Sequence, residues 1–305
     1  MPLRHIAIPS SPGRIPPRCP TYALANRIQS KLQQELLAWK ASPVAPPPVP
    51  ALISFTPAPT YTLGRRQTEP LSTEELARLR APLRVLQSRS GDADDKVNGN
   101  DKAFAFTPEV LHAPRGGLAT YHGPGQVVLW PVIDLRSPLH THFGVREYTC
   151  LLEKTTIATL RRLYGIEGFT TSNPGVWVRH SGTEERKVSA LGVHLRRHVT
   201  GLGVAINFGM PVAGPEDVNP WARIIACGLG DKGVTSVAAQ LKSPSTPRGE
   251  DIATAWVAEF ATRLEIHDNT DGGLAVEQHN WDRLETELQI GRESQDYIEA
   301  RELLT

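Results

Sequence analysis

The stretch Arg115-Gly116-Gly117-Leu118-Ala119-Thr120-Tyr121-His122-Gly123-Pro124-Gly125-Gln126 is the most distinctive part of this chain of 305 residues. Its glycines suit backbone that turns with positive φ or lies close to another group, and the apolar run at 127–133 predicts a buried strand. A simple hairpin turn would also explain Gly-Pro-Gly. The arginine, threonine, histidine and glutamine within the same twelve residues favour a ligand-binding loop instead.

Composition excludes several classes of function. The formal net charge is +1, which offers no electrostatic attraction for nucleic acid or a membrane surface. The three cysteines, Cys19, Cys150 and Cys227, form no CxxC pair, so a disulfide scaffold or structural zinc site is not expected and a reducing compartment is favoured. No apolar run approaches the ~20 residues of a membrane-spanning helix. These features predict a soluble protein.

The spacing of apolar residues predicts alternating helices and strands. A capping box formed by Ser72 and Glu75 predicts a helix through Leu79, and Gly165 in the C′ position predicts the end of a long helix. The other predicted helices cover residues 21–40, 145–164, 251–264 and one or two within 281–304, and the predicted strands cover 51–55, 60–64, 84–89, 176–178, 187–195 and 199–208. This mixture predicts an α+β fold with a mixed β-sheet and flanking helices.

The ends of the chain and one internal stretch differ from this pattern. Residues 1–20 carry arginines but no acidic residue, which is the bias of a targeting segment, and the prolines at 9, 12, 16, 17 and 20 place the start of ordered structure near Thr21. We expect one main domain at 21–241. Residues 90–114 are predicted to be a polar, turn-rich surface insertion, with a composition also typical of disorder, and residues 242–305 a helical C-terminal extension.

Two residues of the second half are candidates for chemistry. Cys227 lies on a glycine-flanked turn, where its thiol would be accessible to an acyl group. A thiol needs a base or a nearby cation to become a nucleophile, and Lys187, which heads a strand with glycines, could be that group. The spacing alone leaves two alternatives open: Cys227 is an inert packing residue, and Lys187 is a solvated surface charge. Glycines 192, 201 and 203 interrupt two strands, which indicates bulges or close approach of a ligand.

Other motifs are weak or absent. Gly201-Leu202-Gly203 lacks the third glycine of a dinucleotide fingerprint, and neither a Walker-type loop nor a GxSxG elbow occurs. His140-Thr141-His142 has no third ligand at a suitable spacing and is interpreted as a loop. We therefore expect no metal and no cofactor.

Four stretches in order resemble the lipoyl(octanoyl) transferase family. The stretch 115–126 looks like that family's signature, and residues 59–65, 187–193 and 224–228 match further blocks. The match covers roughly residues 21–241. It implies the fold of biotin and lipoate protein ligases. It also implies the first step of endogenous protein lipoylation, the transfer of an octanoyl or lipoyl group from acyl carrier protein to a lysine of a lipoyl domain.

By the same resemblance, Cys227 would be the nucleophile that carries the acyl group as a thioester, and Lys187 its acid/base partner. The acyl tunnel would be lined by residues from three stretches: Arg115, Gly116, Gly117, Leu118, Ala119, Thr120, Tyr121 and His122; Ala190, Leu191 and Gly192; and Gly203, Val204 and Ala205. His122 is interpreted as shaping the site rather than as the catalytic base. One departure is Leu202, where the family usually has a histidine before the glycine.

The resemblance also implies partners and a compartment. Octanoyl-acyl carrier protein would be the donor, and the acceptors would be lipoyl domains of 2-oxoacid dehydrogenase complexes and the glycine cleavage H protein. The acid-free start favours the mitochondrion, with the cytoplasm as the alternative for a bacterial chain. Two other functions stay open: an ATP-dependent lipoate or biotin-type ligase, which would not need Cys227, and a homologue that only binds an acyl chain.

Overall fold

A mixed β-sheet forms the centre of the molecule. The computed structural model describes residues 3–10, 18–86, 103–180, 182–224, 233–241, 247–265 and 276–279. Within them, eight strands form the main sheet in the order β12-β10-β11-β8-β2-β1-β13, with β9 beside β10. Their bounds are β1 Leu3–Ala7, β2 Ala51–Phe55, β8 Gln126–Val132, β9 Val176–Arg179, β10 Glu185–Arg196, β11 Val199–Asn207, β12 Gly233–Val234 and β13 Val276–His279. Strand β1 is parallel to both of its neighbours, β2 and β13. Along the series β10, β11, β8 and β2, each strand is antiparallel to the next one.

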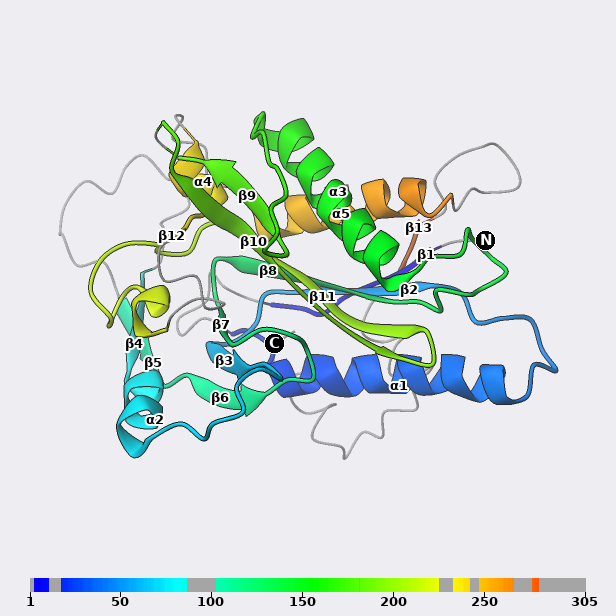
Figure 1. Cartoon of the computed structure of the whole chain (residues 1–305), viewed down its shortest axis with the longest axis horizontal. Helices are drawn as coiled ribbons and strands as arrows, with labels where there is room; N and C mark the ends of the chain where they lie inside the picture. Colours follow the sequence, from blue (N-terminus) through cyan, green and yellow to red (C-terminus); the bar gives the residue numbers. More distant parts are fainter. Residues whose placement is uncertain are drawn as a thin grey trace.

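Three long helices cover the two faces of this sheet. Helix α1 (Tyr22–Ala41) lies along one face, and α3 (Val145–Tyr164) and α5 (Gly249–Arg263) lie together on the other (Figure 1). The Thr21 side chain caps α1 by accepting a hydrogen bond from the Leu24 backbone N–H, at 3.0 Å. Each helix buries its apolar side against the sheet, so two hydrophobic cores form, one on each face.

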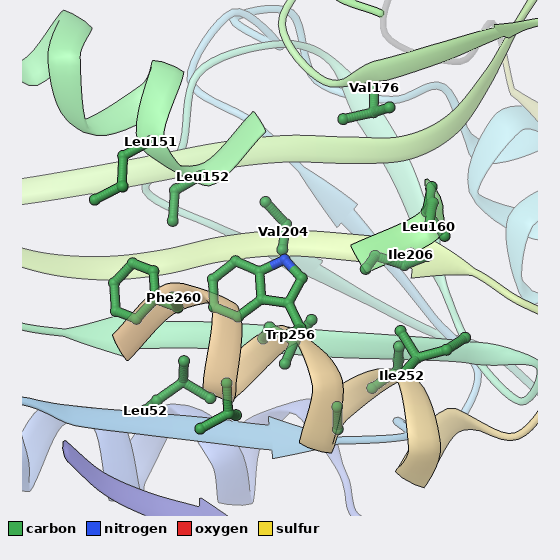
Figure 2. Packing of buried hydrophobic residues seen from close by; sticks show 14 of the residues in the cluster. Leu52, Leu151, Leu152, Leu160, Val176, Val204, Ile206, Ile252, Trp256 and Phe260 are labelled. Atoms are coloured by element: carbon green, nitrogen blue, oxygen red, sulfur yellow. The ribbon is translucent and has the colours of Figure 1, made fainter. Parts of the chain in front are cut away.

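The larger core is built around helix α5. Trp256 and Phe260 belong to the same core as Val204 and Ile206 of β11, and the Trp256 ring lies next to Val204 (Figure 2). The indole N–H of Trp256 donates to the Thr156 hydroxyl at 2.9 Å, so the polar atom of this fully buried ring is satisfied. Helix α5 is therefore an integral part of the domain.

Shorter elements lie beside the main sheet. A second sheet has the order β6-β3-β7, and β4 pairs with β5. The bounds are β3 Thr60–Leu63, β4 Leu83–Leu86, β5 Ala103–Phe106, β6 Glu109–His112 and β7 Ala119–His122, with helices α2 Thr73–Arg80 and α4 Val237–Gln240 and the 3-10 helix η1 Pro220–Arg223. Strand β7 leads through the turn at 123–125 directly into β8. The loop at 115–118 is thereby placed between the second sheet and the main sheet.

Many local predictions are confirmed. The α+β class, the mixed sheet and the flanking helices are as expected, the helix predicted at 145–164 is α3, and Gly165 after it has a φ of +65°. The capping box of Ser72 and Glu75 is formed at α2. The strand predicted at 84–89 corresponds to β4, and its residues 87–89 lie outside the described residues, as do the helices expected within 281–304.

Three expectations about the periphery were wrong. Ordered structure does not begin near Thr21, because β1 pairs with both β2 and β13 inside the main sheet. Of the stretch 90–114, expected to be turn-rich, residues 90–102 lie outside the described residues; the remainder contains β5 and β6, and β6 pairs with β3. The segment after residue 241 is not purely a helical extension, because α5 lies in the core and β13 is a strand of the main sheet.

No helix in the described ranges is long and apolar enough to cross a membrane.

Candidate active site

A cavity of about 260 Å³ lies between the loop at 115–117 and the hairpin of β10 and β11. Most of the residues predicted to form the acyl tunnel line it, namely Arg115, Gly116, Gly117, Thr120, His122, Ala190, Leu191, Gly192, Gly203, Val204 and Ala205. Lys187 also lines it. A larger open groove, of about 750 Å³, lies between the end of α3 and β9, but it contains none of the motif residues. The smaller cavity is therefore the candidate site.

Three predicted tunnel residues lie off the cavity. Tyr121 is buried against the rings of Tyr61 and Trp221, at centroid distances of 5.1 and 6.0 Å. Leu118 accepts a hydrogen bond from Arg115 through its backbone carbonyl, and Ala119 pairs with Leu63 across the second sheet. These three residues therefore support the loop rather than face the cavity.

Several lining residues were not predicted. They are Tyr22, Arg66, Trp130, Thr149, Asn173, Pro174, Val193 and Leu202. Val193 belongs to a motif block, and Leu202 marks the departure from the family pattern, so both could have been considered. Trp130 belongs to β8, in the apolar run that directly follows the motif loop, and Arg66 directly follows the block at 59–65. The remaining four come from α1, α3 and a loop before β9, and no local pattern marks them.

The buried side chain of Arg115 clamps the loop in place. Its guanidinium donates to the backbone carbonyl of Thr62 at 2.6 Å and to the Thr62 hydroxyl at 2.7 Å, and further to the carbonyls of Gly116 and Leu118. A planar guanidinium has several fixed donors, so one side chain can join the loop to β3. Gly117 has a φ of +83°, which a residue with a Cβ rarely adopts.

The glycines of β10 and β11 allow other parts of the protein to approach the backbone closely. A Cβ on Gly192 would lie 2.7 Å from Arg115 Cδ, and one on Gly203 would lie 2.2 Å from the Leu129 carbonyl oxygen of β8. A Cβ on Gly201 would lie 2.4 Å from Gln33 Nε2 of α1. The sequence predicted bulges or close approach of a ligand at these positions; the close groups that the structure shows are a neighbouring strand, a helix and the Arg115 side chain.

Lys187 is held in the wall of the cavity. A register shift between β10 and β9 falls between Lys187 and Ser189, and such a bulge re-aims a side chain. The Lys187 ammonium donates to the carbonyl of Pro174 at 3.0 Å and lies 4.7 Å from the centroid of the Trp177 ring. Both contacts fix the position of a nitrogen that is almost fully buried.

Cys227 lies outside the described residues, so its distance from Lys187 is not part of the site geometry. The strand that follows it is described. In β12, Val234 pairs with Lys187, and the Thr235 backbone N–H donates to the Lys187 carbonyl at 2.9 Å. Of the other two cysteines, Cys19 is partly buried, and this burial raises the pKa of its thiol to about 12, which makes it a poor nucleophile.

His122 begins a chain of buried hydrogen bonds that leads to the backbone beside Lys187. Its Nδ1 lies 2.8 Å from Gln126 Oε1, Gln126 Nε2 donates to Asn207 Oδ1 at 2.8 Å, and Asn207 Nδ2 donates to the Thr235 carbonyl at 3.0 Å. Burial and the nearby charge of Arg115 lower the pKa of His122 to about 4, although the Gln126 bond opposes the shift. His122 is therefore neutral at physiological pH, and in this network its Nδ1 carries the proton.

The buried histidines make stability depend on pH. Burial also lowers the pKa of His5 to about 4; His5 lies 2.8 Å from the Ser54 hydroxyl. An unfolded histidine titrates near 6.5, so as the pH falls from 6.5 to 4 the unfolded state binds protons that the folded state excludes. We expect the free energy of unfolding to be constant above pH 6.5 and to fall below it, by about 3 kcal/mol for each of His5 and His122 at pH 4.

Urea unfolding followed by circular dichroism between pH 4 and 8 measures this loss. The variant His5→Gln keeps a hydrogen-bonding group beside Ser54 but cannot titrate, so its pH slope should be shallower than that of the wild type. An unchanged slope in this variant would contradict the assignment to His5.

Comparison with known proteins gives the family. A family model described as lipoyl protein ligase A/B catalytic domain matches residues 22–261. A Schizosaccharomyces pombe protein named probable octanoyltransferase is 36% identical over 219 residues, which cover 71% of this chain and 80% of that protein. A Kluyveromyces lactis protein named mitochondrial octanoyltransferase is 28% identical and matches 78% of this chain and 66% of its own length.

The fold has solved counterparts. A bipartite lipoate protein ligase from Thermoplasma acidophilum superposes with a TM-score of 0.54 at 12% identity, covering 98% of this chain and 97% of that one. At this identity the likeness shows the fold alone, and it confirms the predicted lipoate protein ligase fold. The match to the family model over most of the chain agrees with the order of the four motif blocks, two of which, 115–126 and 187–193, line one cavity, and the chain therefore belongs to the lipoyl protein ligase A/B catalytic domain family.

Proposed function

We propose that this protein is an octanoyltransferase that moves an octanoyl group from an acyl carrier protein to a lysine of a lipoyl domain. The observation that carries the proposal is the cavity itself, lined by the family's motif residues and with the buried ammonium of Lys187 in its wall. The names of the curated relatives from S. pombe and K. lactis support it.

In the first step, Lys187 would act in its uncharged amine form: Cys227 Sγ attacks the thioester carbonyl of the donor while the Lys187 amine accepts the thiol proton and becomes an ammonium. The tetrahedral intermediate collapses, the bond to the carrier sulfur breaks, and that sulfur takes the proton back from Lys187. In the second step, the amine of the acceptor lysine attacks the Cys227 thioester. An amide forms, the Cys227 thiolate leaves, and Lys187 relays the proton from the amine to it.

This route needs no activation by a nucleotide. Exchange of one thioester for another is nearly balanced, and aminolysis of a thioester to an amide is downhill. A lipoate ligase of the same fold would instead activate a free acid with ATP. That alternative differs from the proposal in its need for Cys227, and the experiment below separates the two.

The acceptors are proposed to be lipoyl domains of 2-oxoacid dehydrogenase complexes and the glycine cleavage H protein. We place the reaction in the mitochondrion because relatives from K. lactis and Saccharomyces cerevisiae, 28% and 26% identical, are named mitochondrial octanoyltransferases.

Incubation of the full chain with octanoyl-acyl carrier protein, followed by intact-mass measurement, tests the function. We expect a mass increase of one octanoyl group in the wild type and none in Cys227→Ser. Cys19→Ser and Cys150→Ser, at the chain's other cysteines, are matched controls that should still be acylated. If the protein transfers free octanoate in a reaction that requires ATP, and Cys227→Ser keeps this activity, the protein is a ligase and not a transferase. If Cys150→Ser is the only variant that loses the adduct, the nucleophile is Cys150 and not Cys227.

A further inference from the structure

Leu202 has a backbone conformation that is rare for a leucine. It lies within β11 with a φ of +61°, in the left-handed region that a side chain with a Cβ seldom adopts. The other described non-glycine residues with positive φ lie in the turn between β10 and β11, Arg197 and His198, or directly after α5, Glu265. Only Leu202 among the described residues combines this conformation with burial inside a strand.

The conformation changes the side of the sheet on which the side chain lies. Successive residues of a strand face opposite sides, and along β11 Val199 and Ala205 belong to the core beneath α1, whereas Val204 and Ile206 belong to the core beneath α3 and α5. Alternation would place Leu202 with Val204. It packs instead in the α1 core, because the positive φ reverses its direction.

Two glutamines of α1 hold this reversal in place. Gln29 Oε1 accepts the Leu202 backbone N–H at 2.6 Å, and Gln33 Nε2 donates to the Thr200 carbonyl at 2.9 Å. Gln29 is buried, as is the Leu202 N–H it binds. A buried backbone donor without a partner is costly, so the Gln29 side chain and the conformation of Leu202 support each other.

The reversed side chain lines the same cavity as Lys187, at the other end of the β10 wall. In the β10–β11 ladder Leu202 pairs with Val193, which lies six residues beyond Lys187 along β10. Apolar groups surround this end of the cavity, including Tyr22, Trp130 and Val193. A hydrocarbon chain whose carboxyl end reacts near Lys187 would therefore direct its methyl end toward Leu202.

We propose that Leu202 is the specificity-determining residue that limits the length of the acyl chain, and that Gln29 is its positioning residue. The inference rests on the proposed octanoyl transfer. Removing the leucine side chain lengthens the cavity at the end remote from chemistry, and enlarging it shortens the cavity. One methylene gained or lost in an apolar pocket changes kcat/KM by about 10- to 200-fold.

The test measures kcat/KM for transfer of hexanoyl, octanoyl, decanoyl and dodecanoyl groups from acyl carrier protein to a lipoyl domain. For the wild type we expect a maximum at octanoyl. For Leu202→Ala we expect the decanoyl-to-octanoyl ratio to rise at least about 10-fold, and for Leu202→Phe the hexanoyl-to-octanoyl ratio to rise. Gln29→Ala should broaden the profile as Leu202→Ala does, whereas Gln29→Glu keeps an acceptor oxygen and should restore the wild-type profile.

Leu195→Ala is the matched control, because Leu195 is a half-buried leucine of β10 that does not line the cavity; its chain-length ratios should equal those of the wild type. Circular dichroism shows which variants fold, and Leu202→Phe retains a test of the inference if Leu202→Ala does not. The inference is overturned if a folded Leu202 variant transfers octanoyl groups, as the wild type does, and has the same chain-length ratios as the wild type. Failure of the wild type to transfer any acyl group would overturn the proposed function instead.

Discussion

The variant Lys187→Met is expected to lower kcat for octanoyl transfer at least about 100-fold, because a positioned acid/base group contributes about 10²- to 10⁴-fold. Methionine fills a similar volume beside Trp177, so the packing of β9 on β10 should be kept. The Lys187 nitrogen lies in the cavity wall, in contact with the Pro174 carbonyl and the Trp177 ring, and it is the acid/base group through which the proposed route moves its protons. We therefore expect both acylation of Cys227 and transfer to the acceptor to slow, as measured by rapid-quench intact mass.

A second variant at this position distinguishes the loss of proton transfer from the loss of positive charge, and a variant of another lysine is the control. Lys187→Arg keeps the positive charge but holds its proton at all working pH values, and it should be as impaired as Lys187→Met. Lys154→Met removes an exposed lysine of α3 and should react like the wild type. Rates within about threefold of the wild type in a folded Lys187→Met protein would remove Lys187 from the mechanism and leave the cavity without its proposed base.

Deletion of residues 1–10 is expected to prevent stable folding. Strand β1 lies between β2 and β13, so its loss removes two parallel ladders from the main sheet. Leu3, Ile6 and Ile8 are buried, and burial of each such side chain stabilises a protein by about 1.5–3 kcal/mol. Their sum, about 5–9 kcal/mol, is as large as the total stability of many domains. Circular dichroism and thermal unfolding measure the loss.

Single substitutions check that packing is the cause. Ile6→Ala should lower the free energy of unfolding by about 2–5 kcal/mol. Val44→Ala removes methyl groups from a side chain that is 91% exposed and should change it by less than about 0.5 kcal/mol. A truncated chain with the unfolding midpoint of the full chain would show that β1 is dispensable.

The same strand bears on targeting. Residues 1–20 have the composition of a targeting segment, yet they contain β1. We therefore expect protein recovered from mitochondria to retain residues 3–7. An N-terminal sequence that starts after Ala7 in active, folded enzyme would contradict the contribution of β1.

Local patterns were sufficient for much of the fold. Helix α3 was predicted with its bounds because its apolar period and the Gly165 that ends it lie within 21 consecutive residues. Strands β10 and β11 were predicted because they are neighbours in sequence, so the short connection between them and their apolar runs are visible together. Strands β1 and β13 were missed because five- and four-residue strands carry little periodicity, and their pairing joins opposite ends of the chain.

The sequence by itself determined the chemistry that the molecule can offer: the motif loop, the order of the four blocks, and the candidate pair Lys187 and Cys227. Only the tertiary structure decided how these residues are used. It assigned Arg115 to clamping the loop, moved Tyr121 into a side core, and placed Leu202 on the cavity wall through contacts with α1. The reason is physical: residue type and short-range periodicity are local properties, whereas burial, backbone strain and hydrogen bonds between distant elements exist only once the chain has folded.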